Sequence, residues 1–300
     1  GPEVFGMHAN ANITFNLQET NKVIEMVLSI QPRVVSSGGA KSSDETVDDL
    51  AREMLESLPE LLLRDQAGPT TFALGAGGNM NSLGTVLGQE MDRFNRLLKQ
   101  LRRTLVDLRR AIQGLVVMSG ELELMYAKML NNQVPELWVK VAYPSLKPLS
   151  AWMKDLQKRV AFMRNWLEKG EPASFWLPGF FFPQGFMTGV LQNFARRYQV
   201  PIDTLSFGFK VTNVPEGSGV AEGPTDGVFV DGLFLDGAHW NVEAERLEEA
   251  RPGVMYSSLP TVHFIPSVDY EPPTEEYQAP LYKTALRAGV LTTTGASSNF

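Results

Sequence analysis

The sequence predicts an α+β fold: an α-helical part that contains one long helix, followed by a small antiparallel β-barrel. Three observations support this prediction. Apolar residues recur with the period of an α-helix through about the first two-thirds of the 300-residue chain. After Pro201 the period changes to two, as in half-buried strands. Short apolar runs separated by Gly and Pro turns then recur about every ten residues, a spacing typical of small barrels and sandwiches.

Six segments carry the helical pattern. They span about 14–31, 44–58, 82–118, 120–131, 148–169 and 183–199. Pro32 ends the first helix, and Ser43 or Asp44 is expected to cap the second. Pro183 suits the first turn of the last helix, where a backbone N–H would have no helical acceptor in any case. The residues at 33–43 are rich in Ser and Gly and read as a flexible linker.

The segment from about Ser82 to Met118 carries the strongest helical signal. Its apolar side chains recur at alternating intervals of four and three residues; this stripe consists of Leu87, Met91, Phe94, Leu98, Leu101, Leu105, Leu108, Ile112 and Leu115. Such a helix is about 50 Å long at 1.5 Å per residue. It either packs inside a helical layer or forms the seam of a dimerising coiled coil. Gly88, Gly114 and the aromatic Phe94 favour packing inside the chain.

Cationic residues fill many positions between the members of the stripe. They are Arg93, Arg96, Lys99, Arg102, Arg103, Arg109 and Arg110, against the acidic Asp92 and Asp107 in the same segment. The simpler interpretation is the solvated face of a packed helix. The alternative is a basic surface for an acidic partner. The candidate interface residues are Arg93, Arg96, Arg102, Arg103, Arg109 and Arg110.

Alternating runs after residue 200 predict the strands of the barrel. They span 205–212, 228–230, 233–235, 254–258, 261–265 and 289–294. Asp231-Gly232 and Asp236-Gly237 interrupt these runs, and Asp-Gly pairs are typical of tight turns. Together with Asp226 these aspartates recur every five residues, which leaves calcium binding as an alternative. The alternating context favours turns.

Composition narrows the function. A net charge of −7 argues against general binding to nucleic acid or to anionic membranes. No apolar run reaches the roughly 18 residues of a membrane span, and no signal peptide is recognisable. Without cysteine, the chain has no disulfide, no thiolate zinc site and no thiol nucleophile. We therefore expect a folded intracellular protein, and, because the chain begins with Gly1 rather than Met, a piece of a longer one.

The sequence holds no catalytic or nucleotide-binding motif. Gly38-Gly39-Ala40-Lys41-Ser42 superficially resembles a phosphate-binding loop, but no strand leads into it and Lys41 does not follow a Gly. The three histidines, His8, His239 and His263, lie far apart in sequence, which argues against a His-based metal or acid–base site. We therefore expect a non-catalytic module with no cofactor and no metal ion.

Several strings resemble one family. Residues 2–11 (PEVFGMHANA) are similar to the segment that leaves the sixth AAA+ module of dynein heavy chains, and 85–95 (TVLGQEMDRFN) to the start of the long helix in their C-terminal domain. The most specific match is 176–196 (WLPGFFFPQGFMTGVLQNFAR). Residues 232–240 (GLFLDGAHW) and 280–284 (PLYKT) follow in the same order. The resemblance covers essentially all 300 residues, and the final TTTGASSNF is most like inner-arm axonemal dyneins.

The resemblance implies a part of a motor. Dynein heavy chains are ATP-hydrolysing microtubule motors, and their nucleotide sites would lie upstream of this chain. Residues 1–31 would be the end of the sixth AAA+ module and a connecting helix, 32–200 the helical part of the C-terminal domain, and 201–300 its β-barrel part. That domain packs across the AAA+ ring and tunes force, processivity and coupling between modules.

The same resemblance implies the partners and the location. The AAA+ modules of the same heavy chain would contact this domain, and the six candidate arginines would face either the ring or solvent. The expected location is the cytoplasmic axoneme of a cilium or flagellum. The alternative function is a docking module that binds another axonemal or regulatory protein through its barrel.

Overall fold

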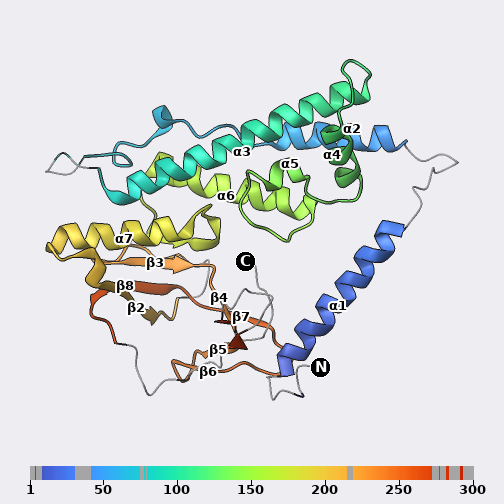
Figure 1. Ribbon diagram of the computed structural model, residues 1–300. Coiled ribbons are helices and arrows are strands. Elements are labelled where there is room, and N and C mark those ends of the chain that lie inside the picture. Colours follow the sequence, from blue (N-terminus) through green and yellow to red (C-terminus); the bar gives the residue numbers. More distant parts are fainter. Residues whose placement is uncertain are drawn as a thin grey trace. The chain divides into compact units, whose positions relative to one another are not determined.

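The structure is a computed structural model of the chain (Figure 1). It describes residues 4, 9–30, 42–74, 78, 80–214, 219–271, 277, 282–283 and 291–292. The chain forms two compact units. The sheet unit comprises Gly1–Val35, Ala173–Leu177 and Leu205–Asn299; the helical unit comprises Ser36–Pro172 and Pro178–Thr204, with Phe300. Helices and small sheets together confirm the α+β class, whereas the domain boundaries after residues 31 and 200 stay predictions.

Six helices lie close to where the sequence predicts them, although α1 (Ala9–Ile30) begins five residues earlier, and the short α5 (Glu136–Val139) was not predicted. The helices are α1 in the sheet unit and α2 (Ser43–Ser57), α3 (Ser82–Ile112), α4 (Gly120–Leu130), α5, α6 (Leu149–Lys169) and α7 (Pro183–Tyr198) in the helical unit, with short 3₁₀ turns at Arg64–Gln66, Leu177–Gly179 and Ile202–Thr204. The cap of α2 is Ser42, one residue before the expected one. Its hydroxyl accepts from the Glu45 N–H at 3.1 Å, and the Glu45 carboxylate accepts from the Ser42 N–H at 2.9 Å. Most of the predicted linker at 33–43 lies outside the described residues.

Helix α3 forms the centre of the helical unit and packs against α2, α6 and α7. The stripe from Leu87 to Leu108 is buried as predicted, and because residues of the same chain cover it, the coiled-coil interpretation is wrong. The helix ends at Ile112, six residues before the predicted end. Gly114 adopts a φ of +74° there, which stops the helix, and Leu115 beyond it is 66% exposed.

Aromatic side chains fill the space beneath the middle of α3. The rings of Trp138 and Trp152 stack with centroids 5.9 Å apart, and Phe94 meets Phe181 edge-on at 5.1 Å. The indole N–H of Trp138 donates to the Thr104 hydroxyl at 2.9 Å, so burial of this ring leaves no donor unsatisfied. The Met and aromatic residues at helical spacing are therefore core, as the sequence indicates.

An ion cluster closes one edge of this core. Asp155 on α6 accepts from Lys147 and from Arg159, each at 2.6 Å, and the Arg159 guanidinium lies 3.9 Å from the centre of the Tyr143 ring. Burial acts to raise the pKa of the Asp155 carboxyl, but the two cations outweigh it and lower the pKa. The carboxylate therefore stays charged, and both cations hold it in the first third of α6.

The described residues of the sheet unit form one larger sheet and three strand pairs. The four-stranded sheet has the order β1 (Ser174–Trp176), β3 (Val228–Asp231), β8 (Val262–Val268) and β2 (Leu205–Val211), with β1 parallel to β3 and the other pairs antiparallel. The two-stranded sheets pair β4 (Phe234–Asp236) with β7 (Tyr256–Ser258), β5 (Ala238–Asn241) with β6 (Arg246–Glu249), and β9 (Tyr282–Lys283) with β10 (Leu291–Thr292).

The predicted antiparallel barrel is wrong for the described residues, because these sheets do not close. A barrel needs two neighbours for every strand, whereas β1 and β2 are the edges of the four-stranded sheet. Gly232 and Gly237, at φ +83° and +77°, cut the run that follows β3 into short separate strands. β1 also comes from a distant part of the chain and pairs in parallel. A period of two predicts strands but not how they join.

The aspartates of these turns and the histidines have structural contacts. Asp231 accepts from the hydroxyls of Ser174 and Thr261, each at 2.5 Å. His263 Nε2 lies 2.8 Å from the Asp226 carbonyl oxygen, and His239 Nε2 lies 3.3 Å from Arg251. Within the described residues no group of three or more acidic or His side chains is placed to hold a metal ion. His8 lies outside the described residues.

The first helix, α1, is fixed at its start to the strand region. The Asn10 side chain donates to the Val254 carbonyl at 2.8 Å and accepts from the Gly253 N–H at 3.0 Å.

Among the helices in the described ranges, none combines the length and the apolar character that crossing a bilayer requires.

Candidate functional site

The basic face of α3 contains arginines of two kinds, and the first kind is paired within the chain. Arg109 binds both carboxylate oxygens of Asp48 on α2, at 2.8 and 3.2 Å, and these hydrogen bonds raise the pKa of Arg109. Arg93 lies 3.1 Å from the Glu90 carboxylate and 5.2 Å from the centre of the Phe182 ring. Both arginines therefore hold α3 against its neighbours in the helical unit.

Glu90 itself is a buried side chain on α3 whose carboxylate binds the backbone that precedes α7. It is 1% exposed and accepts from the backbone N–H groups of Phe181 and Phe182, at 2.5 and 3.1 Å, just before α7 begins. Burial raises the pKa of Glu90, although these donors and Arg93 act to lower it. Glu90 thus joins the first third of α3 to the start of α7.

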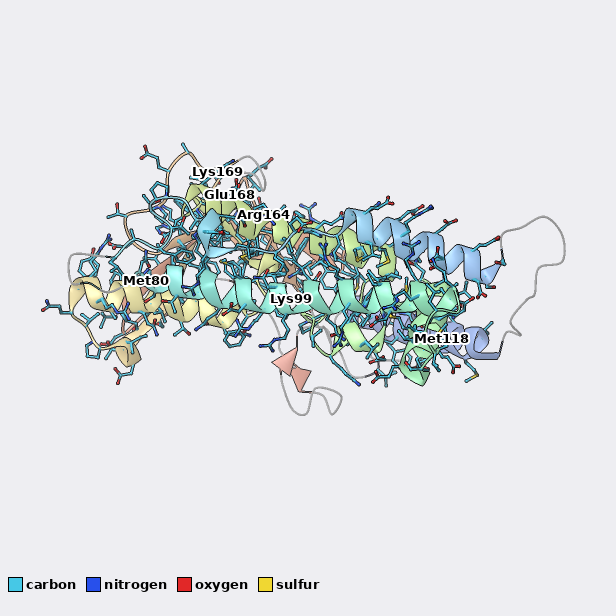
Figure 2. All side chains as sticks on the ribbon, turned by 90° about the horizontal axis from the view of Figure 1, so that it is seen from above. Met80, Lys99, Met118, Arg164, Glu168 and Lys169 are labelled. Atoms are coloured by element: carbon cyan, nitrogen blue, oxygen red, sulfur yellow. The ribbon has the colours of Figure 1, made fainter. Side chains whose placement is uncertain are left out.

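The second kind of cation points outward from α3. This outer row consists of Arg96, Lys99, Arg103 and Arg110, which are all exposed and recur at intervals of three, four and seven residues. Arg103 donates to Gln100 at 2.9 Å; in the described part of the chain no ion pair engages Arg96, Lys99 or Arg110. At 1.5 Å per residue the row extends over about 21 Å. Lys99 lies near the middle of the helix (Figure 2).

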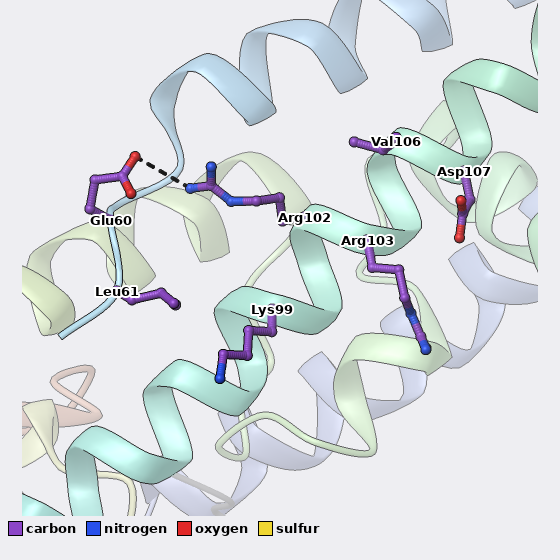
Figure 3. A pocket seen from close by; sticks show the side chains of 7 residues that line it. All are labelled: Glu60, Leu61, Lys99, Arg102, Arg103, Val106 and Asp107. Atoms are coloured by element: carbon purple, nitrogen blue, oxygen red, sulfur yellow. Dashed lines mark ion pairs between the residues drawn. The ribbon is translucent and has the colours of Figure 1, made fainter. Parts of the chain in front are cut away.

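A groove of about 470 Å³ lies beside the outer row, between α3 and the segment that follows α2. Its lining residues are Glu60, Leu61, Lys99, Arg102, Arg103, Val106 and Asp107. Arg102 reaches across to Glu60, 3.5 Å away, whereas Arg103 points to the other side of the helix (Figure 3). Lys99 lies one turn before them on α3 (Figure 3), and Val106 and Leu61 give the groove an apolar part.

The wall of the groove opposite α3 is held from two sides. The Asn95 amide accepts from the Leu62 N–H at 2.8 Å and donates to the Leu62 carbonyl at 2.7 Å. From α6, Arg164 donates to the carbonyls of Glu60 and Leu61 at 2.7 and 3.4 Å. Since these bonds fix the backbone at 60–62, the groove is formed before anything binds in it.

The structure thus separates the six candidate arginines. It places Lys99, Arg102 and Arg103 in the lining of the groove, where Arg102 faces the opposite wall and Arg103 points away from it. It places Arg96 and Arg110 at the ends of the outer row, and assigns Arg93 and Arg109 to contacts inside the chain. Lys99 was missing from the candidates although its spacing fits the row. The wall residues were missed as well, because the chain positions that pair with α3 lie 33 or more residues away and no local pattern marks them.

The sequence is similar to proteins of one family along nearly its whole length. A family model for the C-terminal domain of the dynein heavy chain matches residues 17–300. Dynein axonemal heavy chain 6 from Homo sapiens is 47% identical over 318 residues, which cover 100% of this chain and 8% of that protein. Dynein axonemal heavy chains 1 and 3 from Homo sapiens are each 44% identical over 100% of this chain, which covers 7% of each. The chain therefore spans less than a tenth of the length of these relatives.

Proposed function

The chain belongs to the family of dynein heavy chains and matches their C-terminal domain, and we propose that it is a non-catalytic regulatory and structural domain of an axonemal dynein motor. In this proposal it packs across the ring of AAA+ modules of its heavy chain and tunes force, processivity and the coupling between modules. ATP hydrolysis takes place elsewhere in the heavy chain, and the location is the axoneme of a cilium or flagellum, as the names of the relatives suggest.

The observation that supports this role best is the construction of α3. It is a 31-residue helix, about 46 Å long at 1.5 Å per residue. Its stripe is buried against three helices, so it is held as a rigid element, while the outer row remains available on the opposite side. A rigid element of this length can contact neighbouring modules. It couples them if its contacts are stronger in one state of the ring than in another.

Truncation of the complete heavy chain after Thr204 tests the proposal. This cut removes β2 and the strands after it, at the point where the sheet unit resumes. We expect ATPase activity, gliding velocity and stall force to change together, because the ring loses one of its constraints. Hydrogen exchange of peptides from α3 and α6 in the same protein reports whether the helical unit stays folded. Wild-type values of all three motor parameters in a folded truncated protein would contradict the proposal.

One observation favours the alternative, a docking module for another axonemal or regulatory protein. Among the described strands β2 is at the edge of its sheet, and Phe209 on it is largely exposed, as in sheets that accept a partner strand. If this alternative is correct, the chain retains a defined axonemal protein in a pull-down and a Phe209→Lys variant loses it, while the truncated motor moves normally.

A further inference from the structure

We propose that the groove between α3 and residues 60–62 seats an acidic segment of the same heavy chain, from outside residues 1–300. This inference rests on the proposed function and deepens it, because it names one contact surface and the chemistry of its occupant. That occupant offers two or more carboxylates and at least one aliphatic side chain.

Charge is the first argument. Seven cations lie between residues 91 and 110 against two acidic residues, in a chain whose net charge is −7. Arg93 and Arg109 are paired inside the chain, and Arg102 already pairs with Glu60 at the groove. Lys99 and the outer row beyond it have no anionic partner in the described residues. An acidic segment complements this row, whereas a basic or neutral segment does not.

Shape is the second argument. The hydrogen bonds from Asn95 and Arg164 fix the wall of the groove, so an incoming segment does not have to order it. The lining also contains two aliphatic side chains, Val106 on α3, which is 41% exposed, and the half-buried Leu61 on the opposite wall. A purely ionic ligand would leave both uncovered. A segment that carries an aliphatic side chain beside its carboxylates covers at least one of them and also meets the cations.

The strength of such contacts indicates the source of the segment. Each exposed ion pair strengthens binding by about two- to fivefold, so three or four of them give a dissociation constant between about 0.1 M and about 1 mM. That is too weak to retain a separate protein at cellular concentrations. A segment of the same polypeptide has an effective concentration on the order of millimolar and can occupy the groove. More than nine-tenths of a heavy chain like the relatives lies outside this chain.

Zero-length cross-linking of the complete heavy chain tests the inference. A water-soluble carbodiimide joins the Lys99 amine to a carboxylate that touches it, and mass spectrometry of the monomeric product identifies the partner peptide. We expect a link from Lys99 to an Asp or Glu outside residues 1–300 of the same chain. Arg103→Glu should lower the yield about fivefold, and Glu60→Gln should raise it because a competing carboxylate is removed. Lys154→Glu, an exposed change on α6, should leave it unchanged.

Two results would overturn the inference. If Lys99 links only to Glu60 or Asp107, the groove is empty in the intact motor. If Lys99 links to a different polypeptide, the groove is a docking site for a separate protein, and the acidic segment does not come from the same heavy chain. Neither result affects the truncation experiment. If truncation changes the motor but Lys99 links to no carboxylate outside residues 1–300 of the same chain, the proposed function stands and only the occupant of the groove is wrong.

Discussion

Replacing Glu90 with leucine is expected to lower the free energy of unfolding by about 3 kcal/mol. The carboxylate is buried and accepts from the backbone N–H groups of Phe181 and Phe182. Leucine fills similar space, but it leaves two partly buried backbone donors without their acceptor, and a buried donor without an acceptor costs about 1–3 kcal/mol. Urea unfolding of the 300-residue chain, followed by tryptophan fluorescence, measures the change.

Two variants serve as controls for Glu90. Gln89→Leu alters an exposed neighbour on the same helix and should change stability by less than about 0.5 kcal/mol. Glu90→Gln keeps one acceptor and should lose less than the leucine variant. An equal loss in Gln89→Leu and Glu90→Leu would show that α3, and not the buried carboxylate, is sensitive.

The glutamine variant also has a distinct pH dependence. Because burial raises the pKa of Glu90 in the folded chain, the folded state binds a proton at a pH where the unfolded chain has lost it. The contribution of the protonated side chain is complete below the unfolded pKa and is lost as the pH rises through the folded pKa. Glutamine does not titrate, so the stability difference between wild type and Glu90→Gln should shift across that window and stay constant outside it.

Replacing Phe94 with alanine should cost about 3–5 kcal/mol, more than the change at Glu90. The ring is 0% exposed and contacts Phe181 edge-on at 5.1 Å and Tyr143 at 6.3 Å. Alanine leaves a cavity that Phe181 and Tyr143 cannot fill unless the segments that carry them shift toward α3. Phe94→Leu should lose less, and the exposed Val106→Ala should lose under about 0.5 kcal/mol. A Phe94→Ala variant with wild-type stability would exclude this packing.

Glu90 and Phe94 lie one turn apart on α3, and both contact Phe181, the first through its backbone and the second through its ring. Their effects should therefore not add. A double variant that loses less than the sum of the single variants indicates that they hold one element, the start of α7. A rigid joint there keeps the outer row of α3 at a fixed position, as a structural role in a motor requires.

Periodicity predicts the interior of α3 well, because every stripe residue from Leu87 to Leu108 faces the core on its own helix. It fails at Leu115, since the heptad spacing continues by chance past Gly114, where the backbone turns. The prediction of a closed barrel was wrong for a related reason. Alternation at 205–212 reports one strand and its faces, but the parallel pairing of β1 with β3 joins residues about 55 positions apart, and no local pattern carries that information.

The candidate site was predictable only in part for the same reason. The positions of Arg93 and Arg96 on α3 follow from the sequence, but whether each meets a partner depends on other elements. The carboxylate of Asp48, 61 residues from Arg109, decides that Arg109 is paired inside the chain. The groove depends on the backbone at 60–62, which Asn95 and Arg164 hold in place. A run of basic residues thus predicts a charged surface, but it does not predict which of those side chains are already paired inside the chain.

The most direct test of the central claim is a complete heavy chain that carries Arg96→Glu, Lys99→Glu and Arg103→Glu together. These side chains are exposed, so the domain should stay folded, with hydrogen exchange of peptides from α3 and α6 as the check. If the outer row contacts the ring, gliding velocity or ATPase activity changes by about twofold or more, and Lys154→Glu leaves both unchanged. Wild-type velocity and ATPase activity in the folded triple variant would contradict the account.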